Sequence, residues 1–342
     1  MDIIMVEYCM KKKADAKKIA TWIIVPLMIA IFVLDIVTVA LGNHYAKRYT
    51  IENETYTYKY GNDRIHFLSS GASDAILLES NGMFALIDSG EGNNNPRRST
   101  SYEGYEEEVV EYLKKVAVNE SGKVELAFII GTHCHYDHIG AFGAIINDAD
   151  IIINKAYFKE FDPEIAKDYE IDSWHIDTVY SDIISALNEK NISVISDVPD
   201  TLQLGDFALE LYNTVNSPEL YGEGENAASI GVKVTKGEKS AFLASDFTKS
   251  CGLEQLYGEE IGEIDLLKAG HHGYYGSSSQ KFLEQLSPEL IIVTNRLGKV
   301  YPNVKWNFTM SAKVPYYATY DNNGIIASFT DDNKIVLTNN IH

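Results

Sequence analysis

Cysteine and positive charge are both scarce in this sequence. The 342 residues contain only three cysteines, Cys9, Cys134 and Cys251, which provide no disulfide framework, and we do not expect a bridge between Cys134 and Cys251. Lysine and arginine total 29 against 49 aspartates and glutamates, which leaves a formal net charge of −20. This acidity disfavours a partner that is held by a broad basic surface, such as long nucleic acid.

Charged residues are also nearly absent from one early segment. Residues 19–42 are apolar apart from a few positions such as Asp35, and they follow a stretch, 1–18, that contains a cluster of lysines. About 20 apolar residues suffice for a helix to cross a bilayer. We therefore predict a basic cytoplasmic tail over 1–18, a single transmembrane anchor over 19–42 and a linker over 43–54. Because lysines favour the cytoplasmic side, the C-terminal domain is expected outside the cell.

The alternatives to a membrane anchor are a core helix and a cleaved signal peptide. A core helix of a soluble protein is disfavoured because the apolar residues surround the predicted helix instead of forming one stripe. A cleaved signal peptide, which would make the protein secreted, fits the small residues at 38–40 and 40–42. The apolar stretch is longer than the usual core of a signal peptide, which favours an anchor that is retained.

From residue 55 onward the sequence consists of short apolar or alternating segments that are separated by turn residues. We predict one domain over 55–342. Helices are expected over 106–118, over 178–191 with Asp177 as a potential N-cap, and over 279–286. The expected strands cover 55–60, 64–68, 74–78, 83–87, 124–131, 151–153, 192–195, 201–204, 207–212, 226–234, 240–246, 264–270, 289–294, 316–320, 325–329 and 334–337.

Four potential metal ligands fall within six residues. The stretch 132–140 reads THCHYDHIG, so that His133, His135, Asp137 and His138 lie on the turn that leaves a predicted buried strand. The whole chain has nine histidines, and three of them lie here beside an aspartate, which disfavours an ordinary surface or core role. Imidazole and carboxylate together suit zinc or its divalent neighbours.

Three more predicted strand ends carry residues of the same kinds. Asp88 precedes a glycine at one strand end, Asp246 ends the strand at 240–246, and His271 and His272 follow the strand that starts at 264. Taken alone, an aspartate at such a place is often only a turn former or a helix cap. The order Asp88, then H-x-H-x-D-H, then Asp246, then His-His-Gly resembles the metallo-β-lactamase superfamily over about residues 60–340.

This resemblance implies an α/β fold, the four-layer αββα sandwich, which here is preceded by one transmembrane helix. The runs at 226–230, 244–246 and 266–273 resemble one branch of the superfamily. That branch includes the bacterial phosphorylcholine esterases and the outer domain of the competence DNA-uptake proteins. A single-pass protein of the bacterial cell membrane is therefore expected, with the domain extracellular.

The resemblance also implies a site for two divalent metal ions, with zinc expected and manganese as the alternative. One ion would be held by His133 and His135, and the other by Asp137, His138 and one of His271 and His272. Asp246 would bridge both ions, and Asp88 would support the metal loop from behind. Many members carry a further histidine before the bridging aspartate. Only His175 lies in that interval, on an irregular stretch, and we do not expect it to be a ligand.

Such a site implies hydrolysis, because a divalent ion lowers the pKa of its bound water from about 15.7 toward about 7. Asp137, Asp88 and the pair His271 and His272 are the expected catalytic residues, and the histidine of the pair that is not a ligand would bond a substrate oxygen or protonate the leaving group. Cys134 is expected to point away from the ions. Residues expected to shape substrate choice are Asn226, Trp174, His175 and Tyr274.

The branch resemblance favours a small or polymer-linked phosphodiester at the cell surface. A lactone or amide hydrolase is the alternative within the same fold, since a two-ion site also attacks acyl carbons. A metal-binding membrane module without catalysis is the third hypothesis, because one expected histidine ligand is missing.

Overall fold

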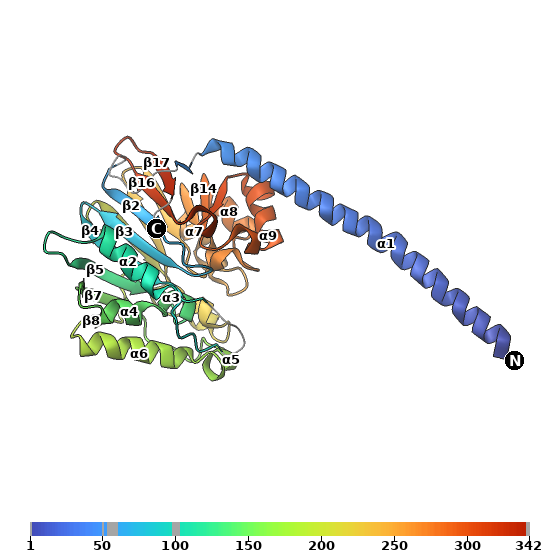
Figure 1. The fold of residues 1–342 in the computed structure, drawn as a ribbon, viewed down its shortest axis with the longest axis horizontal. Helices are drawn as coiled ribbons and strands as arrows, with labels where there is room; N and C mark the ends of the chain where they lie inside the picture. The colour runs from blue at the N-terminus through green and yellow to red at the C-terminus, as the bar shows by residue number, and fades with distance from the viewer. Residues whose placement is uncertain (1, 50, 53–60, 98–102, 340–342) are drawn as a thin grey trace.

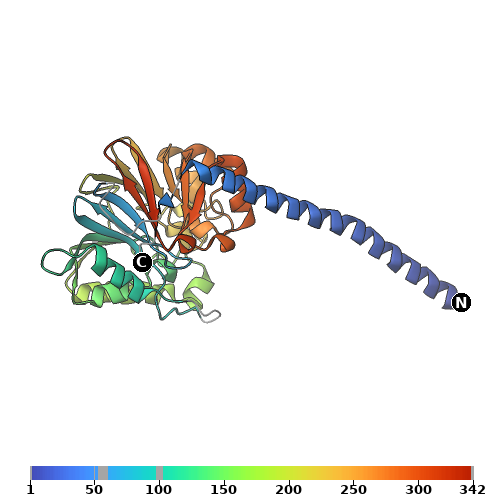
Figure 2. The same ribbon diagram turned by 45° about the horizontal axis from the view of Figure 1, so that its top comes forward.

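The computed structural model describes residues 2–49, 51–52, 61–97 and 103–339. A 44-residue helix, α1 (Asp2–Tyr45), projects from a two-sheet body, as two views of the ribbon show (Figures 1 and 2). At 1.5 Å per residue such a helix is about 66 Å long, so it exceeds the hydrocarbon core of a bilayer, about 30 Å. Thr21–Arg48, which covers the second half of α1 and the three residues after it, is the one described segment that is long and apolar enough to cross a membrane.

The first sheet has ten strands in the order β1-β17-β16-β2-β3-β4-β5-β7-β8, with β6 paired to β5. Its middle is antiparallel from β16 to β4, and the strands from β4 to β8 are parallel. The strands are β1 (Ile51–Glu52), β2 (Asp63–Phe67), β3 (Ala75–Ser80), β4 (Met83–Ser89), β5 (Val124–Gly131), β6 (Ile151–Ile153), β7 (Lys155–Phe158), β8 (Ser193–Ile195), β16 (Ile325–Phe329) and β17 (Ile335–Asn339).

The second sheet has seven strands in the order β15-β14-β13-β12-β11-β10-β9. Strands β9 to β12 form an antiparallel meander, and β12 to β15 are parallel. Its strands are β9 (Thr201–Leu204), β10 (Phe207–Tyr212), β11 (Gly231–Lys236), β12 (Lys239–Leu243), β13 (Leu266–Lys268), β14 (Leu290–Val293) and β15 (Tyr316–Ala318).

Helices cover the outer face of each sheet. The first sheet carries α2 (Glu106–Val116), α4 (Phe142–Asn147) and α6 (Ile176–Glu189), with the short α3 (Tyr136–Ile139) and α5 (Asp168–Asp172) beside them. The second carries α7 (Leu253–Ile261), α8 (Gln280–Leu286) and α9 (Pro302–Trp306). Three apolar layers result, one under each set of helices and one between the sheets, and the predicted four-layer αββα sandwich is confirmed.

The strand pattern explains how both faces of each sheet are buried. On β14, Leu290 and Ile292 enter the layer between the sheets, whereas Ile291 and Val293 pack under the helices. Successive side chains of a strand point to opposite faces, so an unbroken apolar run such as this one serves both layers. The helices need only one apolar stripe, which α6 supplies at Ile176, Val179, Ile183 and Leu187.

Several predicted elements require correction. Residues 226–228, which were predicted as the start of a strand, belong to a short 3-10 helix, Glu225–Ala228, and β11 begins only at Gly231. Strand β12 ends at Leu243, so Asp246 lies in the loop that follows it. The residue that precedes α6 is His175, with a left-handed backbone, and Asp177 lies inside the first turn. The strand predicted over 55–60 falls outside the described residues.

The C-terminal end of α1 is fastened to the body. The Tyr317 hydroxyl lies 3.0 Å from the carbonyl oxygen of Ala46 and 2.6 Å from that of Tyr49, and Arg48 donates to the carbonyl of Lys313 at 2.9 Å. A side chain at Gly42 would approach the Tyr316 hydroxyl to 3.2 Å, so glycine permits close contact there. The predicted tail and the predicted transmembrane segment are thus parts of one continuous helix, α1. The C-terminal end of this helix contacts the second sheet at β15.

Candidate metal centre

The predicted ligands converge at the carboxyl ends of strands from both sheets. The segment after β5 provides His133 and His135 and then α3 with Asp137 and His138, and the segments after β12 and β13 provide the other ligands. The carboxyl ends of neighbouring strands are where open α/β sheets bind their ligands. Here two such edges, one from each sheet, face each other across the middle layer.

Backbone strain is concentrated at this edge. Asp88, Ser245, His271 and His272 all have left-handed backbones, with φ between 44° and 55°. Such conformations are costly for residues other than glycine and gather at functional sites, where the surrounding structure enforces them. Each of these four residues lies at or just after the end of a strand, so the strain turns side chains sharply into the space between the sheets.

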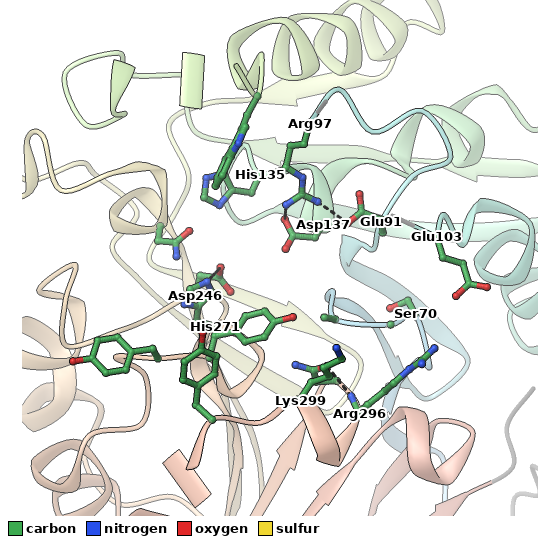
Figure 3. Close-up of a pocket in the computed structure, with 18 of the residues that line it drawn as sticks. Ser70, Glu91, Arg97, Glu103, His135, Asp137, Asp246, His271, Arg296 and Lys299 are labelled. Atoms are coloured by element: carbon green, nitrogen blue, oxygen red, sulfur yellow. Dashed lines mark hydrogen bonds and ion pairs between the residues drawn. The ribbon is translucent and has the colours of Figure 1, made fainter. Parts of the chain in front are cut away.

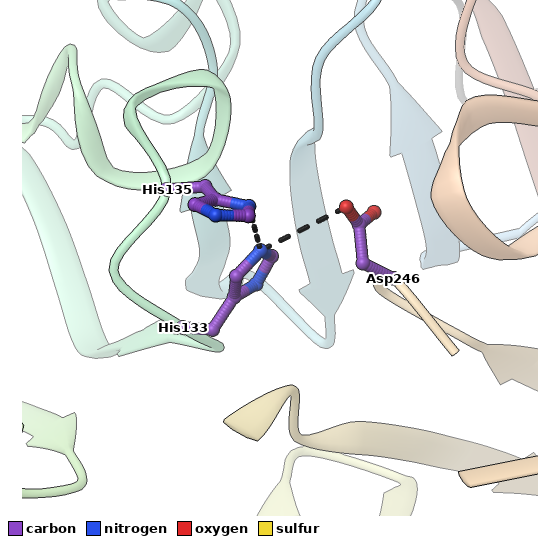
Figure 4. A group of neighbouring side chains, drawn as sticks. All are labelled: His133, His135 and Asp246. Atoms are coloured by element: carbon purple, nitrogen blue, oxygen red, sulfur yellow. Dashed lines mark hydrogen bonds and ion pairs between the residues drawn. The ribbon is translucent and has the colours of Figure 1, made fainter. Parts of the chain in front are cut away.

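One group of potential ligands consists of His133, His135 and Asp246 (Figure 4). The Nε2 atom of His133 lies 3.2 Å from Nδ1 of His135 and 3.8 Å from Oδ2 of Asp246. All three side chains are buried. The three donor atoms face one another, which is the arrangement that one ion between them requires.

A second group consists of Asp137, His138 and His272. The Nε2 atoms of the two histidines are 3.2 Å apart. Asp137 Oδ2 lies 3.8 Å from the Nε2 atom of His272. Asp246 serves this group through its other oxygen, Oδ1, at 3.2 Å from His138 Nε2 and 3.4 Å from His272 Nε2. One carboxylate therefore turns one oxygen toward each group.

These residues fit a pair of divalent cations. Asp137 Oδ1 and Asp246 Oδ1 are buried and accept no hydrogen bond from the described residues, with Arg97 at 3.5 Å from the first and His138 Nε2 at 3.2 Å from the second. Buried carboxylates are costly unless nearby positive charge compensates them. The two imidazole nitrogens that face each other at 3.2 Å in the second group also favour a positive charge between them. Nitrogen and carboxylate donors in this mixture suit zinc and its divalent neighbours.

His138 and His272 each have a polar partner at Nδ1, on the side of the ring away from the other candidate ligands. His138 Nδ1 lies 2.7 Å from Asp88, whose oxygens also accept hydrogen bonds from the backbone and hydroxyl of Thr132 at 2.8 Å each. Asp88 thus lies where the sequence predicts it, behind a ligand. His272 Nδ1 is 3.1 Å from the Thr294 hydroxyl and 3.3 Å from Asp74 Oδ1. Such partners fix the tautomer that leaves Nε2 facing a metal.

The sequence interpretation missed several of these supporting residues. Asp74 pairs with the fully buried Lys268; burial alone would raise the pKa of Asp74, but the Lys268 ammonium and His272 hold it below its usual value. Glu170, on α5, lies 3.2 Å from His135 Nε2. A lysine inside the apolar run that forms β13 was a signal for the first pair. Nothing in the sequence pattern signals Glu170.

The structure distinguishes the two adjacent histidines. His272 is fully buried within the second group. The side chain of His271 is 30% exposed, and its Nε2 lies 3.8 Å from Asp246 Oδ2. His271 lines the cavity in front of the ligand groups, so it faces the space that a substrate would occupy.

A cavity of about 710 Å³ opens in front of the ligand groups. His135, Asp137, Asp246 and His271 reach its wall, as Figure 3 shows. Three of the predicted substrate-binding residues line it, namely Asn226, Trp174 and Tyr274. The fourth, His175, lines a different cavity beside Tyr136, so its predicted place at the mouth is wrong.

Cys134 does not offer a nucleophile to this cavity. Its side chain is buried and packs in the apolar layer under the helices, while its backbone amide donates to Glu225 at 2.8 Å. Burial and the neighbouring Glu225 carboxylate hold the pKa of the thiol well above its usual value. Cys134 and Cys251 are both free.

Fold and ligand order together define the class of this protein: it is an αββα sandwich with candidate ligands in the order of the metallo-β-lactamase superfamily. The chain is 30% identical over 97 residues to Recombination protein 2 of Haemophilus influenzae, a match that covers 28% of this chain and 11% of that protein. It is 27% identical over 179 residues to ComE operon protein 3 of Bacillus subtilis, which covers 51% of this chain and 20% of that protein.

The chain therefore corresponds to a small part of these relatives. Among solved structures, the metallo-beta-lactamase fold protein YhfI from Bacillus subtilis is similar with a TM-score of 0.45 and 13% identity, over 78% of this chain and 98% of that one. No protein-family model matches the chain. The resemblance that the motifs predict is confirmed by the fold and the sequence matches.

The placement of Asp246 between the two groups predicts a specific metal defect. Asp246→Asn keeps the shape of the side chain but removes the charge that holds two cations close together. We expect bound metal per chain, measured by mass spectrometry after dialysis, to fall by about half or more. Asp206→Asn, at the exposed turn before β10, is the matched control. Full occupancy in the Asp246 variant would rule out its bridging role.

Proposed function

We propose that this protein is a membrane-anchored hydrolase that uses two divalent metal ions, expected to be zinc, to cleave a phosphodiester. The observation that carries the proposal is the carboxylate of Asp246, whose two oxygens face two separate ligand groups at the inner wall of one cavity. A single structural ion would need only one such group, and a closed one.

When bound, two such ions supply hydroxide from water at neutral pH and stabilise the charge that develops on the attacking and leaving oxygens. The chain's own residues determine the geometry of that chemistry. The partners Asp88, Thr294 and Glu170 keep the imidazoles oriented before substrate arrives, so little reorganisation is needed during the reaction. The buried walls between the two sheets limit access of bulk water to the inner end.

His271 is suited to donate a proton to the leaving group of the substrate. It borders the cavity beside Asp246, and its Nδ1 atom is buried without a hydrogen-bond partner among the described residues. Asn226 contributes from another part of the wall, and its Oδ1 atom likewise lacks a described partner. Because both residues line the cavity, we propose that their side chains bond substrate oxygens or hydroxyls.

The adjacent histidines provide a matched pair of variants. His271→Ala should leave the metal content unchanged and lower kcat about 100-fold or more, because general acid catalysis typically contributes that much. His272→Ala should instead lose metal, because it removes a ligand. Metal analysis and steady-state kinetics on the same preparations test both expectations. Loss of metal in the His271 variant with retention in the His272 variant would reverse the two assignments.

The reaction class can be tested on a small panel of substrates. The detergent-solubilised full chain should hydrolyse bis-p-nitrophenyl phosphate faster than a lactone or nitrocefin. A chelator should abolish turnover, and zinc or manganese should restore it. The Asp246→Asn variant, purified in parallel, controls for contaminating phosphodiesterases. Rapid lactone hydrolysis with intact phosphodiester would replace this proposal by the acyl-hydrolase alternative, and no turnover of any substrate by metal-loaded protein would favour a non-catalytic module.

We further propose that α1 crosses the bacterial cell membrane with the lysines of residues 11–18 in the cytoplasm and the sandwich outside. The charge asymmetry around the apolar segment supports this direction. The C-terminal end of α1 lies against the second sheet at Gly42 and continues into the segment fastened at Ala46, so an anchor of this kind would leave the membrane directly beside the sandwich.

Protease added to intact cells tests this orientation. With the sandwich outside, the protease should remove the C-terminal domain while a cytoplasmic marker protein stays intact. A C-terminal tag and an antibody against the tag report the loss. Protection of the domain in intact cells, followed by digestion after lysis, would place it on the cytoplasmic side.

A further inference from the structure

We propose that Arg296 and Lys299 form a second anion subsite, so that the preferred substrate carries another phosphate beside the phosphodiester that is cleaved. This inference rests on the proposed function and specifies its substrate class. Both residues line the 710 Å³ cavity, and Figure 3 shows them on the wall across from Arg97 and Asp137. The subsite is therefore separate from the metal ligands but opens onto the same space.

Arg296 and Lys299 form no ion pair with a carboxylate in the described part of the chain. Three lysine or arginine side chains line the cavity in the described part of the chain: Arg97, Arg296 and Lys299. Arg97 pairs with Glu91 at 2.7 Å and with Asp137 at 3.5 Å. Neither Arg296 nor Lys299 forms an ion pair with a described carboxylate, although the chain as a whole carries a net charge of −20.

The loop that carries the two cations is held in place. The Arg296 guanidinium stacks on Tyr320, with 3.7 Å between Cζ and the ring centroid. The backbone amide of Leu297 donates to Asp321 at 2.6 Å, and that of Arg296 donates to Asn295 at 2.8 Å. A guanidinium whose face rests on an aromatic ring keeps its N–H edges free for bidentate contact with a phosphate.

The same loop is tied directly to the metal centre. The buried side chain of Asn295 donates to the carbonyl of His272 at 3.0 Å, and the amide of Tyr301 donates to the carbonyl of Gly273 at 3.0 Å. These two hydrogen bonds join the cationic loop to the segment that carries a candidate ligand. The spacing between the ions and the cations is thus fixed by the fold, and a substrate with two phosphates at a matching spacing would contact both.

Binding of simple phosphates tests the subsite without requiring turnover. The zinc-loaded full chain in detergent is titrated with bisphosphates of straight-chain alkanediols of increasing length and with the corresponding monophosphates. At one matching length, we expect the bisphosphate to bind at least about tenfold more tightly, which corresponds to about 1.4 kcal/mol. The difference should shrink as salt is raised, because exposed charges are screened.

Substitutions test whether Arg296 and Lys299 cause the preference for the bisphosphate. The double variant Arg296→Ala, Lys299→Ala should bind the bisphosphate and the monophosphate equally, whereas Lys281→Ala, an exposed lysine outside this cavity, should behave as wild type. Arg296→Lys should retain part of the preference. Equal binding of both ligands by the wild type at every length, or a preference that survives in the double variant, would overturn the proposal.

A kinetic arm separates this inference from the proposed function. Two p-nitrophenyl alkyl phosphodiesters are compared, one ending in a phosphate and the other in a hydroxyl. The wild type should show a higher kcat/KM for the first, and the double variant should lose only that advantage. Turnover of both esters at equal rates would refute the proposed subsite and would support the proposed phosphodiesterase activity. A bisphosphate preference in binding without turnover of either ester would refute the phosphodiesterase and leave the subsite standing.

Discussion

The carboxylate of Asp246 is the contact on which the rest of the site depends. It is buried between four imidazole rings, with Oδ2 near His133 and His271 and Oδ1 near His138 and His272. A buried negative charge is tolerated only with compensation. The two proposed cations would provide that compensation, and the loop after β12 places the side chain between candidate ligands from both sheets. The left-handed backbone of Ser245 makes this turn.

A further set of polar side chains orients the imidazole rings around Asp246. Asp88 behind His138, Thr294 and Asp74 behind His272, and Glu170 behind His135 each fix one imidazole. The Asp74–Lys268 pair links β13 of the second sheet to the segment before β3 of the first. The two halves of the sandwich are therefore joined by ionic contacts at the metal centre as well as by the apolar layer between them.

Much of this structure could be predicted from local sequence. Strands such as β14 follow from short apolar runs and helices such as α6 from apolar periodicity, and several candidate ligands follow from the spacing of His133, His135, Asp137 and His138. The remainder depends on contacts between distant segments. Residues 226–228 were predicted as the start of the strand that continues into the apolar residues after them, yet they belong to a 3-10 helix, Glu225–Ala228, beside the cavity. Glu170 lies on a short helix with no motif, and its role emerges only when α5 packs near His135.

The docked end of α1 has a consequence for how the enzyme would encounter its substrate. A domain on a slack tether sweeps a wide volume and meets its target at an effective concentration set by linker length. Here Tyr317 and Arg48 hold the exit of the helix against the body, so with α1 across a membrane, as proposed, the cavity would keep one height and one tilt above the bilayer. Reaction would then depend on the surface density of groups that protrude to that height, and an identical group closer to the lipid or farther from it would escape cleavage.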